Sequence, residues 1–224
     1  MSPSPWCEPP SAEYGGQPPK GARGLASTAP SRLVIVPGLR GSGEGHWQTW
    51  LEGQFDETVR VEQDDWAAPD LVRWSRRIVE TVGALGPGPH AIVAHSFGCL
   101  AGAHALAAGL PVAHALLVAP AEPARFGLDH ALPWTALPVR SLVVVSDTDP
   151  WMNAGRARLW ARRWGSDCIS LGDAGHVNVA SGFGPFPLAR DWAAYALRGL
   201  PARRSPVGAL HRGAPRRSFA PARG

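Results

Sequence analysis

Three short segments of the chain contain residue types that could act together in nucleophilic catalysis. One is the run Ala94-His95-Ser96-Phe97-Gly98, another ends at Asp149, and the third is Gly175-His176. A serine hydroxyl is a weak nucleophile until an imidazole accepts its proton, and a carboxylate must orient that imidazole and stabilise its charged form. The chain order Ser…Asp…His therefore predicts that Ser96 is a nucleophile, Asp149 its acid and His176 its base.

The segment around Ser96 approximates the nucleophile elbow G-x-S-x-G, in which small flanking residues permit a sharp strand-to-helix turn. Ala94 stands in place of the first glycine. The alternative role for Ser96 is to cap the helix that follows. His95 is the one rival base, and we expect it to be structural or part of the pocket wall, because adjacent side chains of a sharp turn point apart. Cys99 is expected to be a small buried core residue and not a thiol nucleophile.

Alternating apolar runs and helical patterns must position these residues. Because most of the runs are apolar throughout, they indicate parallel strands covered on both faces. We predict a doubly wound, mostly parallel six-stranded α/β sheet with helices on both faces and no large lid domain. The strands expected are Leu33–Val36, Thr58–Glu62, His90–Ala94, Ala115–Val118, Arg140–Val145 and Cys168–Ser170, and the helices His46–Phe55, one with Pro69 in its first turn, Phe97–Ala108, Ala154–Arg163 and Pro187–Arg198.

Ligands of such a sheet bind at the carboxyl ends of its strands, where the serine, acid and histidine segments all fall. Two aspartates, Asp147 and Asp149, follow the fifth strand. We favour Asp149, because the acid in hydrolases of this fold commonly sits in a strand-end turn of the form G-x-x-D. That turn corresponds here to Ser146-x-x-Asp149, and Asp147 stays open as the alternative.

The remaining site residues are expected in loops at the same edge. The backbone N–H groups of Phe97 and Leu39 are the predicted oxyanion hole. The segment Gly41–Trp50 lacks the G-K-[ST] ending of a phosphate-binding loop, so we expect it to shape the oxyanion loop. The side chains predicted to contact substrate are His46 and Trp47 from this segment, and Phe126 and Trp134 from an apolar wall in residues 121–137.

The amino-acid composition argues against a disulfide-rich protein, a metalloprotein and a membrane protein. The three cysteines are odd in number and widely spaced, which predicts neither a disulfide framework nor a metal site, and no cofactor is implied. Residues 1–32, with seven prolines, and 201–224, with six arginines and no acidic residue, are expected to be disordered around one domain at 33–200. Without an apolar run long enough for a secretory signal or a membrane span, we expect a soluble cytoplasmic protein.

A set of longer motifs carries a family resemblance. They are VPGLRGSGEGHWQTWLE (36–52), VEQDDWAAPDLVRW (61–74), AHSFGC (94–99), SDTDPW (146–151) and GDAGHVNVASGFGPFP (172–187). In this order they resemble the small serine-hydrolase family of retinoblastoma-binding protein 9, over residues 33–200. The resemblance implies a compact α/β-hydrolase that cleaves small esters or amides with Ser96, Asp149 and His176. The retinoblastoma-binding motif L-x-C-x-E is absent around the three cysteines, so that partner is not implied.

The expected partner is thus a small-molecule ester or amide, with the ester favoured. The arginine-rich tail lacks the interleaved aromatic residues of a single-strand nucleic-acid binder, so we expect neither a nucleic acid nor a membrane as partner. Oligomeric state, monomer or dimer, stays open. The competing function is a non-catalytic binding module on a hydrolase scaffold, suggested by the basic tail and by Ala94.

Overall fold

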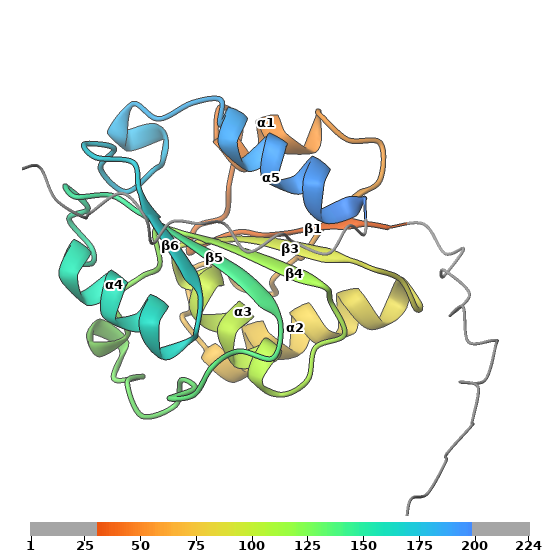
Figure 1. Cartoon of the computed structure of the whole chain (residues 1–224), viewed down its shortest axis with the longest axis horizontal. Helices are drawn as coiled ribbons and strands as arrows, with labels where there is room; N and C mark the ends of the chain where they lie inside the picture. The colour runs from red at the N-terminus through yellow and green to blue at the C-terminus, as the bar shows by residue number, and fades with distance from the viewer. Residues whose placement is uncertain (1–30, 199–224) are drawn as a thin grey trace, which may run out of the picture.

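Six short strands form one parallel sheet in the order β2-β1-β3-β4-β5-β6 (Figure 1). The computed structural model that shows this describes residues 31–198. All five neighbouring strand pairs are parallel, with Leu33 of β1 opposite Ala91 of β3. The predicted fold class is confirmed. The strands are β1 Leu33–Val36, β2 Thr58–Arg60, β3 Ala91–His95, β4 His114–Val118, β5 Arg140–Val145 and β6 Asp167–Ser170.

Helices cover both faces of the sheet, which is why its central strands are apolar throughout. Side chains alternate along a strand, so Val34 and Val36 join the core on one face while Leu33 and Ile35 join the core on the other. Figure 1 shows α2, α3 and α4 on the first face and α1 and α5 on the second. The helices are α1 Trp47–Glu52, α2 Leu71–Ala84, α3 Phe97–Ala107, α4 Ala154–Arg163 and α5 Pro187–Leu197, with 3₁₀ turns at Pro123–Phe126 and Val179–Ser181.

Helix α2 begins later than the sequence predicts. Asp70 is its N-cap, and the Asp70 side chain accepts a hydrogen bond from the Arg73 N–H. Pro69 therefore precedes the helix and does not lie in its first turn. The apolar residues that recur along α2 at intervals of three and four form its buried face, and two of them, Trp74 and Ile78, are fully covered. The Asp70 carboxylate satisfies an N–H group of the first turn that has no partner within the helix, and this cap determines where the helix begins.

The direction of strand order reverses at β1, because β2 lies on one side of it and β3 on the other. In open α/β sheets this switch point opens a crevice at the carboxyl ends of the two diverging strands. Here those ends lead into Pro37-Gly38 after β1 and Ser96 after β3. The fold thus brings the predicted nucleophile and the predicted oxyanion loop to the same place.

The disorder predicted for residues 1–32 and 201–224 falls outside the described residues, apart from Ser31 and Arg32. The Arg32 N–H donates to His90 Nδ1, and its guanidinium pairs with Glu57. The ordered contacts of the domain therefore start just before β1. No helix within residues 31–198 is long and apolar enough to cross a membrane.

Candidate active site

Ser96 occupies a strained turn between β3 and α3. Its backbone has φ 54° and ψ −123°, in a region that residues with a side chain rarely adopt. The turn is held because the Ser96 N–H donates to the Val118 carbonyl over 3.1 Å, and the Ser96 carbonyl accepts from the Cys99 and Ala121 N–H groups. No hydrogen bond joins the Ser96 side chain to the first turn of α3, so capping does not occupy its hydroxyl.

Two glycines allow the elbow to pack against the loop after β1. A Cβ at residue 98 would lie 2.3 Å from the Pro37 carbonyl oxygen, and a Cβ at residue 38 would lie 2.7 Å from the Ser96 Cβ. Both distances are shorter than side chains tolerate, so only glycine permits this approach. The buried Ala94 methyl, which replaces the first glycine of the motif, lies below α3 in the core.

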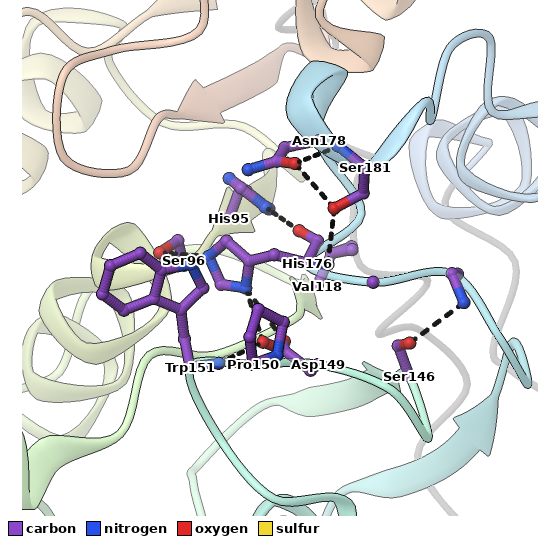
Figure 2. Close-up of polar contacts among 12 residues, drawn as sticks. His95, Ser96, Val118, Ser146, Asp149, Pro150, Trp151, His176, Asn178 and Ser181 are labelled. Atoms are coloured by element: carbon purple, nitrogen blue, oxygen red, sulfur yellow. Dashed lines mark hydrogen bonds and ion pairs between the residues drawn. The ribbon is translucent and has the colours of Figure 1, made fainter.

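His176 joins Ser96 to an aspartate (Figure 2). Its Nε2 lies 2.8 Å from Ser96 Oγ, and its Nδ1 lies 2.9 and 3.0 Å from the two carboxylate oxygens of Asp149. Both side chains are almost completely buried, at 7% and 4% exposed. Because Nδ1–H donates to the carboxylate, Nε2 is left as the acceptor for the serine proton.

The backbone around His176 is fixed from two sides. Its N–H donates to Ser181 Oγ over 2.9 Å, and its carbonyl lies 3.0 Å from His95 Nε2. Val177, the residue after His176, has a φ of 50°, which is strained for a residue with a side chain, whereas Gly175 adopts its φ of 51° without strain. A Cβ at residue 175 would lie 2.4 Å from Ser181 Oγ, which explains the glycine there.

Asp149 and Asp147 have different surroundings. Asp149 is buried, and besides His176 it accepts a hydrogen bond from the Trp151 N–H over 2.8 Å. Asp147 is exposed and pairs with Arg158 over 2.6 Å, and this hydrogen bond lowers the pKa of the Asp147 carboxyl. Of the two aspartates, only Asp149 contacts His176. The geometry thus separates two aspartates that the sequence left as alternatives.

The predicted oxyanion donors are the N–H groups of Phe97 and Leu39. Phe97 is the first residue of α3, so its N–H has no partner within the helix. The loop holding Leu39 is fixed on either side, because Arg40 N–H donates to the Trp66 carbonyl and Gly41 N–H to that of Gly38. No hydrogen bond engages the Leu39 N–H within residues 31–198. Both donors are available at the elbow.

Two further imidazoles lie beside His176. The His95 and His176 ring centroids are 5.0 Å apart, and those of His46 and His95 are 4.9 Å apart. Burial, with smaller contributions from Arg60 and His176, lowers the pKa of His46 to about 4, and burial also places the pKa of His95 well below its usual value. Both imidazoles are therefore neutral near pH 7, and only His176 contacts the serine.

A pocket of about 520 Å³ opens over these residues. Ser96, His95 and His176 form part of its lining, together with the predicted His46 and Phe126. Its size suits a small organic ligand. Several other lining residues were not predicted from the sequence, namely Arg40, Arg125, Trp151, Asn178 and Val179. Trp151 had a usable signal, since it directly follows Asp149-Pro150.

Two tryptophans predicted to contact substrate do not line this pocket. Trp47 is fully buried behind it, edge-on to His95 and Phe186. Trp134 is 56% exposed and packs against Trp160, with the Arg163 guanidinium 3.7 Å from its ring centroid. Trp47 belongs to the hydrophobic core between the sheet and α5. Trp134 packs against two residues of α4, Trp160 and Arg163. The structure corrects both predictions.

Within residues 31–198, no cluster of three or more His, Cys, Asp or Glu side chains could hold a metal ion. That the chain needs no cofactor stays a prediction.

Cys99, the predicted core cysteine, is completely buried, and this burial raises the pKa of its thiol.

Comparisons with known proteins identify the family of this chain. A protein-family model described as serine hydrolase matches residues 33–194. A putative YdeN-like hydrolase from Pectobacterium atrosepticum is 37% identical, with a TM-score of 0.71, over 75% of this chain and 91% of that one. A comparison with the curated proteins found no match.

Two other solved structures share the fold at lower identity. The ydeN gene product of B. subtilis is 18% identical, with a TM-score of 0.63, over 75% of this chain and 99% of that one. Est1E from Butyrivibrio proteoclasticus, solved with ferulic acid bound, is 13% identical, with a TM-score of 0.59, over 75% of this chain and 90% of that one. The chain therefore belongs to the serine hydrolase family of the α/β-hydrolase superfamily, as its resemblance to retinoblastoma-binding protein 9 predicted.

Proposed function

We propose that this protein hydrolyses small carboxylic esters through an acyl-enzyme on Ser96. The observation that carries the proposal is the continuous chain of contacts from Ser96 Oγ through both His176 nitrogens to Asp149, built on a strained elbow. A serine that only capped a helix would need neither the strain nor the buried carboxylate. Family membership supports hydrolysis in general, and the triad roles and the ester preference are our proposal.

In the first half-reaction His176 Nε2 accepts the Ser96 hydroxyl proton while Oγ attacks the ester carbonyl carbon. The carbonyl electrons move to oxygen, and the N–H groups of Phe97 and Leu39 stabilise the resulting oxyanion. When the tetrahedral intermediate collapses, the alkoxide leaves with the proton from Nε2 and the acyl group stays on Oγ. Asp149 holds Nδ1–H throughout and stabilises the transient imidazolium.

In the second half-reaction a water molecule gives a proton to Nε2 and attacks the acyl carbon. The C–Oγ bond then breaks, Ser96 regains its proton from His176, and the carboxylic acid is released. Esters are favoured over amides because resonance stabilises an ester carbonyl less than it stabilises an amide bond. The cytoplasmic location and the absence of nucleic-acid and membrane partners stay predictions, and the oligomeric state stays open.

Active-site labelling tests the nucleophile. A fluorophosphonate probe should label the wild type, whereas Ser96→Ala should not be labelled. Ser166→Ala is a matched control, because Ser166 pairs with Ser141 over 2.6 Å near the start of β5 and does not line the pocket. It should be labelled like the wild type. If Ser96→Ala retains labelling, Ser96 is not the nucleophile. A wild type that is neither labelled nor active on 4-nitrophenyl acetate would favour a non-catalytic binding module.

A further inference from the structure

The polar side chains that face the pocket without a partner are hydrogen-bond donors. His46 Nδ1 accepts from the Gln48 N–H, so the proton of this neutral ring is on Nε2. His46 is only 6% exposed, and no partner for its Nε2 exists among residues 31–198. Asn178 uses its oxygen to accept from the Ser181 N–H and hydroxyl, while its amide nitrogen points away from Ser181 (Figure 2).

Arg125 adds a fixed positive charge beside the triad. Its guanidinium lies 5.1 Å from the Trp151 ring centroid, and its Nη2 donates to the Pro150 carbonyl over 3.1 Å. The Trp151 ring centroid is in turn 6.1 Å from that of His176. No carboxylate pairs with Arg125 within the described part of the chain. The Arg125 guanidinium is therefore held at the pocket by contacts that leave its charge uncompensated.

The rest of the lining does not neutralise this charge. Arg40, on the oxyanion loop, is a second guanidinium without an acidic partner in residues 31–198. The only acidic side chain among the described lining residues is Glu122, whose carboxylate pairs with Arg156 over 3.2 Å. The lining therefore carries two uncompensated arginines, and its remaining free side-chain groups are donors.

Building on the proposed function, we propose that the natural substrate is an ester carrying a carboxylate that Arg125 binds at the pocket mouth, with Arg40 as the second cation. A guanidinium recognises a carboxylate through charge-assisted hydrogen bonds. Trp151, half exposed at the mouth, holds the Arg125 side chain in place and limits the conformational freedom lost on binding. The free donors of His46 and Asn178 suit further acceptor oxygens of the same molecule.

Two pairs of chromogenic or fluorogenic esters test the proposal. One pair is 4-nitrophenyl hydrogen adipate and 4-nitrophenyl methyl adipate, in which the acyl chain is charged or neutral. The other is 4-carboxyphenyl butyrate and its methyl ester, in which the leaving group is charged or neutral. The measured quantity is the ratio of kcat/KM for the charged ester to that for the neutral ester. We expect a ratio of about three to five for at least one pair at low salt, because exposed charge pairs contribute modestly.

Arg125→Gln should bring that ratio close to one, and 0.5 M NaCl should lower it in the wild type. Arg163→Gln is the matched control, because this arginine also lies over a tryptophan but outside the pocket, and it should retain the wild-type ratio. Ratios near one for both pairs, or a ratio that Arg125→Gln leaves unchanged, would overturn the carboxylate site while ester hydrolysis stands. Absence of hydrolysis of all four esters would instead overturn the proposed function, and this inference with it.

Discussion

Acidification should destabilise the fold through the buried imidazoles beside the triad. The pKa of His46 is about 4 in the folded protein, against an ordinary value of 6.5. Between these values the unfolded chain binds more protons than the folded one, so stability falls as pH falls. The contribution of His46 is fully present above pH 6.5. Lowering the pH from 7 to 5 should remove about 1–2 kcal/mol through His46, and His95 acts in the same direction.

The variant His46→Asn isolates this effect. Asparagine is a good N-cap, so it can still accept the Gln48 N–H while removing the titrating group. Urea denaturation at pH 7 and pH 5 gives the free energy of unfolding at each pH. The loss between the two pH values should be about 1–2 kcal/mol smaller in the variant than in the wild type. The same substitution at the exposed His130 controls for the loss of one imidazole, and equal changes in both variants would refute the reasoning.

Three sets of substitutions test the geometry of the site. Gly38→Ala places a methyl against the Cβ of the nucleophile and should lower kcat about 100-fold, measured by ester hydrolysis. His95→Leu leaves the buried His176 carbonyl unpaired and should cost about 1–3 kcal/mol in urea denaturation, while His95→Gln, which keeps a donor, should recover part of both stability and kcat. Asp149→Asn should lower kcat by about 10³–10⁴, and Asp147→Asn, in the same turn, should stay within about threefold of the wild type.

The sheet was predictable because strands that are buried on both faces consist of continuous runs of apolar residues. The bounds predicted for β1, β5 and α4 match those observed. At α2 the boundary moved because the Asp70 side chain caps the helix, and the spacing of apolar residues does not reveal such a local hydrogen bond. The parallel direction of the strands followed from the alternation of strands and helices, whereas the order of the strands in the sheet was not predicted.

The meeting of Ser96, His176 and Asp149 was predictable for a similar reason, since parallel strands deliver their carboxyl ends to one edge. Contacts between segments that lie far apart in the sequence were not predictable. His95 and His176 are 81 residues apart in the sequence, and nothing in either segment signals that one donates to the other. Arg125 and Trp151 likewise meet only because the 3₁₀ turn after β4 packs beside the turn after β5. Trp47 and Trp134 were wrongly predicted to contact substrate, because residue type alone does not distinguish a pocket wall from a hydrophobic core. Trp47 lies in the core.

Hydrogen bonds from the central strands of the sheet hold two strained residues of the site. Ser96 and Val177 both adopt a positive φ, which costs energy at each position. The Ser96 turn is held by the neighbouring β4 strand, and the Val177 segment by a bond from His95, the last residue of β3. The same strand therefore leads into the proposed nucleophile, Ser96, and restrains the loop that carries the proposed base, His176. A shift of β3 would move both together, which preserves the 2.8 Å contact between Ser96 and His176 better than two independent supports would.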